Sequence, residues 1–138
     1  MADLLDHLHG LTLAFTLAAS KETPPGGDLP RADGSSSPDD WRAEIAGRLD
    51  RLAAAWADPT AYDGVTMAGP IEMPAEIAAL VALDEVVVHG WDLARATGQP
   101  YDPDQAAVLA CLGFAESFEP PTDAPGGVRA RRAGRCQL

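Results

Sequence analysis

Apolar residues recur at intervals of three and four along four stretches of the chain, a pattern typical of helices that bury one face. The predicted helices span residues 2–21, 39–57, 75–97 and 103–117. The stretch 75–97 is apolar nearly all round, which predicts a central position in the fold. The apolar face of the first helix comprises Leu4, His7, Leu8, Leu11, Phe15 and Ala18.

The segments between these stretches have the composition of loops. Residues 22–38 are rich in Pro, Gly and Ser, which predicts a flexible linker or a flap. Residues 58–74 contain Asp-Gly and Gly-Pro pairs and predict an irregular connection that includes a short hairpin. Residues 120–138 lack apolar periodicity and predict a disordered basic tail. The sequence therefore predicts one helical domain over residues 1–119.

Helix boundaries carry their own signals. Ser37 or Asp39 can cap the second helix, and Asp58 followed by Pro59 ends it. Gly98 is a natural C-terminal cap for the third helix. Pro103 suits the first turn of the last helix.

The charge of the chain narrows the classes of partner. The formal net charge is −11, and four of the ten basic residues lie in the last ten positions, which leaves six basic against 21 acidic residues in 1–128. Such a surface repels nucleic acids and anionic membranes. No apolar run is long enough to span a membrane. The two cysteines, Cys111 and Cys136, form no metal-binding or disulfide framework, so we expect a cytoplasmic protein.

Three residues combine into a candidate metal site. Glu85 lies four residues before His89, so the two side chains share one helix face, and apolar residues surround Glu85 on both sides. A carboxylate in such a setting is paired, protonated or bound to a metal. His7 is the histidine that faces a core from another helix. Three ligands leave a coordination position open, as in catalytic zinc sites, and a thiol bound there would lose its proton.

Other interpretations of these residues stay open. A histidine inside a helix is often purely structural. Asp92 and Arg95 are interpreted as a surface ion pair. The alternative is that Asp92 orients a ligand histidine. Trp91 is interpreted as core packing or as the wall of a pocket, and Cys111 as a buried small hydrophobic residue.

A family resemblance adds to this interpretation. The stretch LDEVVVHGWDLARATGQPY, residues 83–101, resembles the E-x-x-x-H-x-W-D-L-A-R-A-T-G-Q signature of the mycothiol-dependent maleylpyruvate isomerase N-terminal-domain family, part of the DinB/YfiT-like superfamily. The opening DLLDHLHGLTLAFT resembles the second helix of that family, with its D-L-L-x-H-L pattern. The segment AAAWADPTAYDGVTM resembles the connection into its fourth helix. The resemblance covers residues 2–125.

The resemblance implies an all-α, DinB-like up-down four-helix bundle that binds a divalent metal, typically zinc. The family's ligands are a histidine of the second helix and a glutamate and a histidine of the fourth, which correspond to His7, Glu85 and His89. Family members use a low-molecular-weight thiol such as mycothiol as cosubstrate. The implied partners are therefore a small thiol and a small electrophilic substrate.

The chain also departs from the family pattern. Met1 stands almost at the start of the D-L-L-x-H-L helix, so we expect the bundle to lack its first helix. The basic end differs from the family's apolar ending, and we expect the second domain of the isomerase to be absent. A missing helix exposes apolar stripes, which predicts a less stable monomer and homodimerisation or aggregation.

Three functions are consistent with these features. The first is a thiol-dependent transferase or isomerase that acts on a small electrophile through a metal-bound thiolate. The second is a metal- or ligand-binding bundle without catalysis. The third is a truncated, inactive remnant whose site does not assemble.

Overall fold

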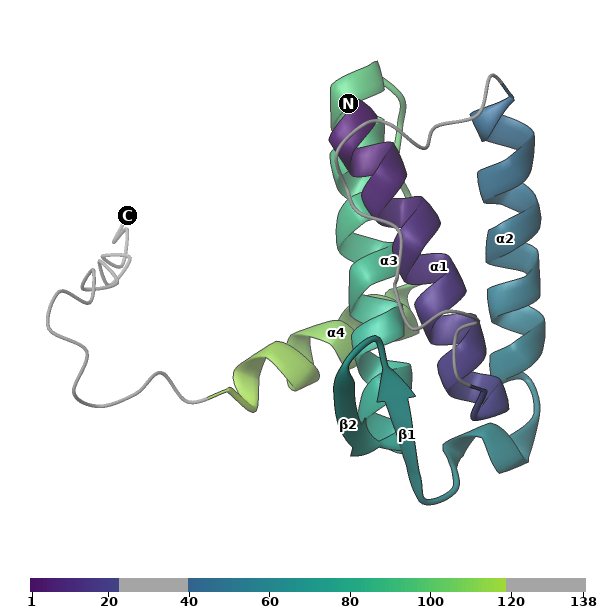
Figure 1. The fold of residues 1–138 in the computed structure, drawn as a ribbon. Coiled ribbons are helices and arrows are strands. Elements are labelled where there is room, and N and C mark those ends of the chain that lie inside the picture. Colours follow the sequence, from purple (N-terminus) through teal and green to yellow (C-terminus); the bar gives the residue numbers. More distant parts are fainter. Residues whose placement is uncertain (23–39, 119–138) are drawn as a thin grey trace, which may run out of the picture.

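The described part of the chain is mostly helical, as predicted. The computed structural model describes residues 1–22 and 40–118, so nearly all of the predicted loop 22–38 and the whole predicted tail 120–138 lie outside the described residues. A short antiparallel hairpin, which the sequence also predicted, precedes the longest helix. The elements are α1 (Ala2–Ser20), α2 (Trp41–Trp56), the 3-10 helix η1 (Pro59–Tyr62), β1 (Val65–Ala68), β2 (Ile71–Pro74), α3 (Ala75–Thr97) and α4 (Gln105–Glu116) (Figure 1).

Helix α1 lies between α2 and α3 and packs against both (Figure 1). Figure 1 shows that α1 and α2 run in the same direction and that α3 runs back alongside them. The predicted up-down alternation is therefore wrong for the first two helices. The long connection after residue 22 makes this possible, because it is long enough to return the chain to the other end of the bundle before α2 begins.

The core is built around α1 rather than around α3. Helix α1 contributes most of the large buried side chains, whereas the buried residues of α3 are all alanines. These small side chains let α1 approach α3 closely, and much of the apolar surface of α3 stays partly exposed. The prediction that residues 75–97 form the central helix is therefore wrong. The core cluster comprises Leu5, Leu8, Leu11, Phe15, Ala18, Ile45, Leu52 and Ala82.

Local capping explains where the elements begin and end. Gly98 takes a left-handed conformation (φ 69°) and ends α3, as predicted. Asp104 caps α4 by accepting hydrogen bonds from the backbone N–H groups of Ala106 and Ala107, so this helix starts at Gln105 rather than at Pro103. The Thr66 hydroxyl donates to the Ala18 carbonyl at 2.6 Å and ties the hairpin to the end of α1.

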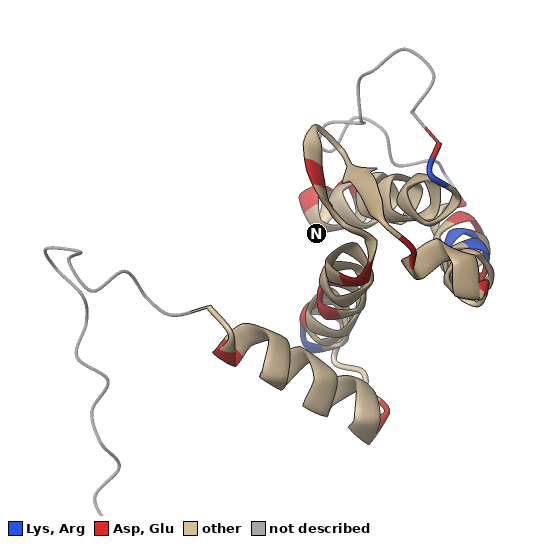
Figure 2. Ribbon diagram, turned by 90° about the horizontal axis from the view of Figure 1, so that it is seen from below, with Lys and Arg blue, Asp and Glu red and all other residues tan. Residues whose placement is uncertain are grey.

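Acidic side chains are spread over the helices and the hairpin. Among the described residues, 16 are acidic and only five are Lys or Arg. Figure 2 shows red segments on each of the α-helices and blue ones mainly on α2. None of the described helices is both long enough and apolar enough to cross a membrane.

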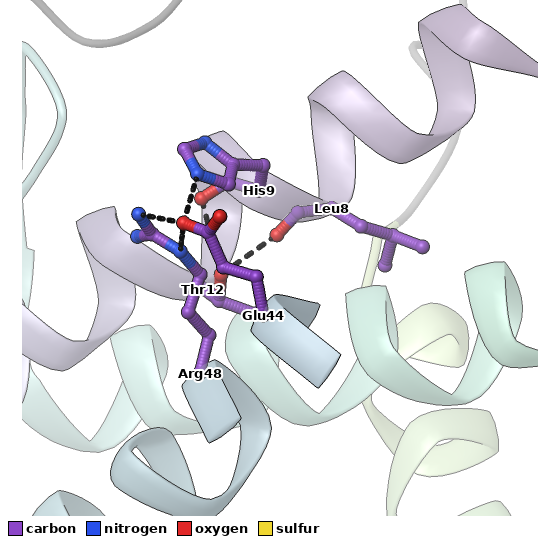
Figure 3. A network of polar contacts seen from close by, with 5 residues as sticks. All are labelled: Leu8, His9, Thr12, Glu44 and Arg48. Carbon is purple, nitrogen blue, oxygen red and sulfur yellow. Dashed lines mark hydrogen bonds and ion pairs between the residues drawn. The ribbon is translucent and has the colours of Figure 1, made fainter. Parts of the chain in front are cut away.

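A polar network joins α1 to α2 (Figure 3). Nε2 of His9 lies 2.9 Å from Oε1 of Glu44, and the Nε and Nη2 groups of Arg48 donate to the same oxygen at 3.1 and 2.9 Å. The hydrogen bonds from His9 and from Arg48 hold the pKa of Glu44 below its usual value. The network fixes α1 and α2 side by side in parallel, with the early part of each at the same end.

We expect the substitution Glu44→Gln to lower the melting temperature at neutral pH by a few degrees. A carboxylate whose pKa is lowered by folding stabilises the fold above its unfolded-state pKa, about 4.3, and this contribution disappears as the pH falls through the lower folded-state pKa. The difference in melting temperature between wild type and variant should therefore shrink as the pH falls below the unfolded-state pKa and close once the pH is below the folded-state pKa of Glu44. Thermal unfolding followed by circular dichroism between neutral and acidic pH measures it.

The matched control is Glu76→Gln, because Glu76 is an exposed glutamate of α3 that makes no hydrogen bond or ion pair with another described residue. This control should shift the melting temperature little at any pH. A Glu44→Gln effect that stays constant down to acidic pH would show that the carboxylate charge is not what stabilises the contact.

Candidate metal centre

The three predicted ligands come together at one place between α1 and α3. Oε2 of Glu85 lies 3.1 Å from Nε2 of His7 and 3.0 Å from Nε2 of His89. The two imidazole rings meet edge to face, with their centroids 4.7 Å apart. One nitrogen or oxygen of each residue lies within 4.8 Å of the corresponding atoms of the other two. The predicted convergence of these side chains is therefore present in the fold.

Packing of the two helices places these side chains. Ala82, one helical turn before Glu85 on the same face of α3, is 4% exposed and belongs to the core against α1. Leu8 and Leu11 are buried on α1 and fix the rotation of this helix, so that His7 points toward α3. Glu85 and His89 therefore continue the face of α3 that packs against α1.

The donor set fits a divalent ion. Zinc bonds to nitrogen and oxygen of about 2.0–2.1 Å in a tetrahedron place neighbouring ligand atoms about 3.3–3.4 Å apart. The observed separations of 3.1 and 3.0 Å from Glu85 to the two histidines need to open by only a few tenths of an ångström. The side chains of His7, Glu85 and His89 are 43%, 32% and 23% exposed, so solvent or a small ligand can reach a fourth position.

Asp92 lies next to His89, one of the three predicted ligands. Its Oδ2 lies 3.0 Å from Nδ1 of His89. When Nε2 is the metal-binding nitrogen, Nδ1 carries the hydrogen and donates it to a carboxylate of this kind. Of the two interpretations of Asp92, the geometry favours the one in which it orients His89. Arg95 instead lies over the ring of Trp91, 5.9 Å from the ring centroid.

We expect Asp92→Ala to weaken metal binding by about 10–100-fold, because an unsupported imidazole loses its orientation and basicity. Asp92→Asn should recover part of the affinity, since an amide oxygen can still accept from Nδ1–H. Competition of each variant with a chromogenic zinc chelator measures the effect. Equal zinc affinities of wild type and Asp92→Ala would show that Asp92 makes no contribution to metal binding.

The burial predicted for Trp91 and the burial predicted for Cys111 have opposite outcomes. Trp91 is 53% exposed, so its interpretation as a core residue is wrong. Cys111 is 8% exposed, which confirms it as a buried small residue. Burial raises the pKa of the Cys111 thiol, and the Asp84 carboxylate adds to this effect, so the thiol stays protonated and unreactive.

Sequence reasoning missed two features next to the ligands. Asp6, directly before His7, is 1% exposed, and its position among buried leucines was the signal that could have drawn attention to it. Gly90 follows His89, and a Cβ at this position would lie 2.7 Å from the hydroxyl of Tyr101. The missing side chain lets Tyr101 pack on α3 and donate a hydrogen bond to the Val87 carbonyl at 2.8 Å.

Comparisons of the chain with known protein families, with curated proteins and with solved structures find no match. The resemblance to the maleylpyruvate isomerase N-terminal domains therefore stays a prediction. The geometry of the three ligands and of Asp92 is the main support for a functional assignment.

Proposed function

We propose that this protein binds one divalent metal ion through His7, Glu85 and His89, and that bound metal is the basis of its activity. The observation that carries the proposal is the convergence of three ligand atoms, from two helices, on one partly exposed point. His7 lies 78 positions from Glu85 in the sequence, and its side chain meets those of Glu85 and His89 only because α1 packs on α3. The contact between Asp92 and His89 is the kind of support that metal-binding histidines have.

Zinc is the metal that we propose for this site. Two imidazole nitrogens and one carboxylate oxygen are ligands that zinc accepts in catalytic sites, where a fourth position is kept for water or substrate. Glu85 would neutralise one of the two charges of the ion, and without metal its Oε2 already lies 3.1 Å from Nε2 of His7 and 3.0 Å from Nε2 of His89. The site is therefore close to its binding arrangement before metal arrives.

We further propose thiol-dependent transfer to, or isomerisation of, a small electrophile, with a low-molecular-weight thiol of the mycothiol type as cosubstrate. A bound divalent ion would lower the pKa of a coordinated thiol and so provide a thiolate nucleophile at neutral pH. His7 and His89 would hold the ion, and Asp92 would hold the His89 ring in place. The resemblance of residues 83–101 to the thiol-dependent family supports this assignment, as does the solvent-exposed side of the site.

Zinc titration and a thiol assay test the proposal in sequence. Isothermal titration of the metal-free chain should show about one zinc ion per chain. The zinc-loaded chain should then accelerate the reaction of a low-molecular-weight thiol with a chloronitrobenzene electrophile, and the acceleration should disappear with His89→Ala. Zinc binding without turnover of any thiol tested would leave a metal-binding protein without this catalysis, and no zinc binding would overturn the proposal as a whole.

A further inference from the structure

Helices α2 and α3 flank α1 but leave an apolar groove between themselves. The groove is open to solvent and has a volume of about 780 Å³, and its lining includes Leu52 and Ala82, which also pack in the core against α1. This groove is separate from the ligand residues of the metal centre, none of which lines it. Its lining residues are Leu49, Asp50, Leu52, Ala53, Trp56, Tyr62, Glu76, Ala79, Leu80, Ala82, Leu83 and Val86.

The shape of the groove suits an α-helix. Apolar side chains recur at helical spacing along both walls, on α2 from Leu49 to Trp56 and on α3 from Ala79 to Val86. Ridges of this kind receive the side chains of a further helix. The lining of α3, from Glu76 to Val86, spans about 15 Å, or nearly three helical turns. Three helices with a gap between the outer two have the arrangement of a bundle that lacks one member.

The charge at the rims indicates what kind of helix fits. Asp50 on α2 and Glu76 on α3 line opposite sides of the groove, and neither makes a hydrogen bond or an ion pair with another described residue. Apart from these carboxylates and Tyr62, the residues that line the groove are mainly apolar. A helix with an apolar stripe and basic side chains on both flanks would bury the stripe and pair its charges with the two rims.

A second copy of this chain is a poorer occupant. Helix α4 has exposed leucines, Leu109 at 61% and Leu112 at 53%, which could enter a groove. However, α4 contains no Lys or Arg, has Asp104 as its N-cap and ends at Glu116. It would place further negative charge beside Asp50 and Glu76, in a pair of molecules that each carry a net charge of −11.

We propose that the groove between α2 and α3 binds a basic amphipathic α-helix of a partner protein. The apolar stripe of that helix packs on Leu49, Leu80 and Leu83, and its Lys or Arg side chains pair with Asp50 and Glu76. Binding there covers apolar surface that the described fold leaves open. The contact completes a four-helix arrangement with a helix supplied by another molecule.

Two matched synthetic peptides test this proposal with the full chain. Each is a fluorescein-labelled, alanine-based helix of about 18 residues, with leucines at i, i+4, i+7 and i+11. One peptide carries lysines beside the leucine stripe and the other carries glutamates at the same positions. Fluorescence anisotropy at low salt should show that the lysine peptide binds at least about tenfold more tightly than the glutamate peptide.

Variants of groove residues provide a second part of the test. The double variant Asp50→Lys with Glu76→Lys changes exposed rim residues and should reverse the preference, so that the glutamate peptide binds more tightly. Ala53→Glu should weaken both peptides, whereas His89→Ala should leave both affinities unchanged. Circular dichroism checks that each variant folds.

Several outcomes would overturn the proposal. These are failure of the lysine peptide to bind, equal binding of the two peptides, or a preference that does not reverse in the double variant. A concentration-dependent dimer that Ala53→Glu dissociates, seen by light scattering, would assign the groove to a second copy instead.

Discussion

The substitution His89→Ala is expected to reduce the zinc content of the chain from about one ion per molecule to nearly none. Loss of Nε2 leaves His7 and Glu85, and two ligands on different helices do not hold zinc against solvent. His7→Ala should have the same result, because it removes the ligand that joins α1 to the site. Equilibrium dialysis followed by elemental analysis measures bound zinc per chain.

The matched control is His9→Ala, which removes a histidine two residues from His7 on the same helix. His9 is paired with Glu44 of α2 and does not belong to the ligand group. Its variant should retain zinc at the wild-type ratio. If His9→Ala lost as much zinc as His7→Ala, the loss would reflect damage to α1, and the ligand assignment would lose its support.

Zinc should also stabilise the fold, because it joins α1 to α3. A ligand that binds only the native state at 100 times its dissociation constant adds about 2.7 kcal/mol to the free energy of unfolding. This increment should be absent in His89→Ala. The two measurements together separate a site in the native fold from zinc bound to unfolded chain, which would not raise the melting temperature.

The candidate site could be predicted from the sequence because each part of it has a local signal. Glu85 and His89 are one helical turn apart in an apolar stretch, and His7 lies on the apolar face of another helix. Helical periodicity fixes which residues share a face, so these positions need no knowledge of the fold beyond one contact between two helices. The structure provides that contact between α1 and α3.

The arrangement of the helices could not be predicted in the same way. An apolar stretch such as 75–97 looks central in the sequence. Burial, however, depends on which helices pack against it, and in this fold α1 is the helix that packs against both α2 and α3. Trp91 and Val88, at 53% and 45% exposed, lie on parts of α3 that α1 does not reach. The pairing of His9 with Glu44 depends on the parallel course of α1 and α2, which the connecting segment does not reveal.

Leu11→Ala is the second large effect that we expect, with a loss of about 2–5 kcal/mol in the free energy of unfolding. Leu11 is 6% exposed in the core cluster, on the helix that packs against both α2 and α3. Truncation of this side chain therefore leaves a cavity in the centre of the fold rather than at the edge of one helix contact. A domain of this size has a total stability of about 5–15 kcal/mol, so the variant should be visibly less folded at equilibrium in low urea. Urea titration followed by circular dichroism measures the change.

Leu109→Ala is the control with the same change of side chain. Leu109 is 61% exposed on α4, so its truncation creates no cavity and should cost no more than about 0.5 kcal/mol. The contrast depends on α1 as the central helix, because a fold built around α3 would make Leu11 peripheral. Similar losses in the two variants would therefore contradict the placement of α1 between α2 and α3, and with it the contact on which the proposed metal centre depends.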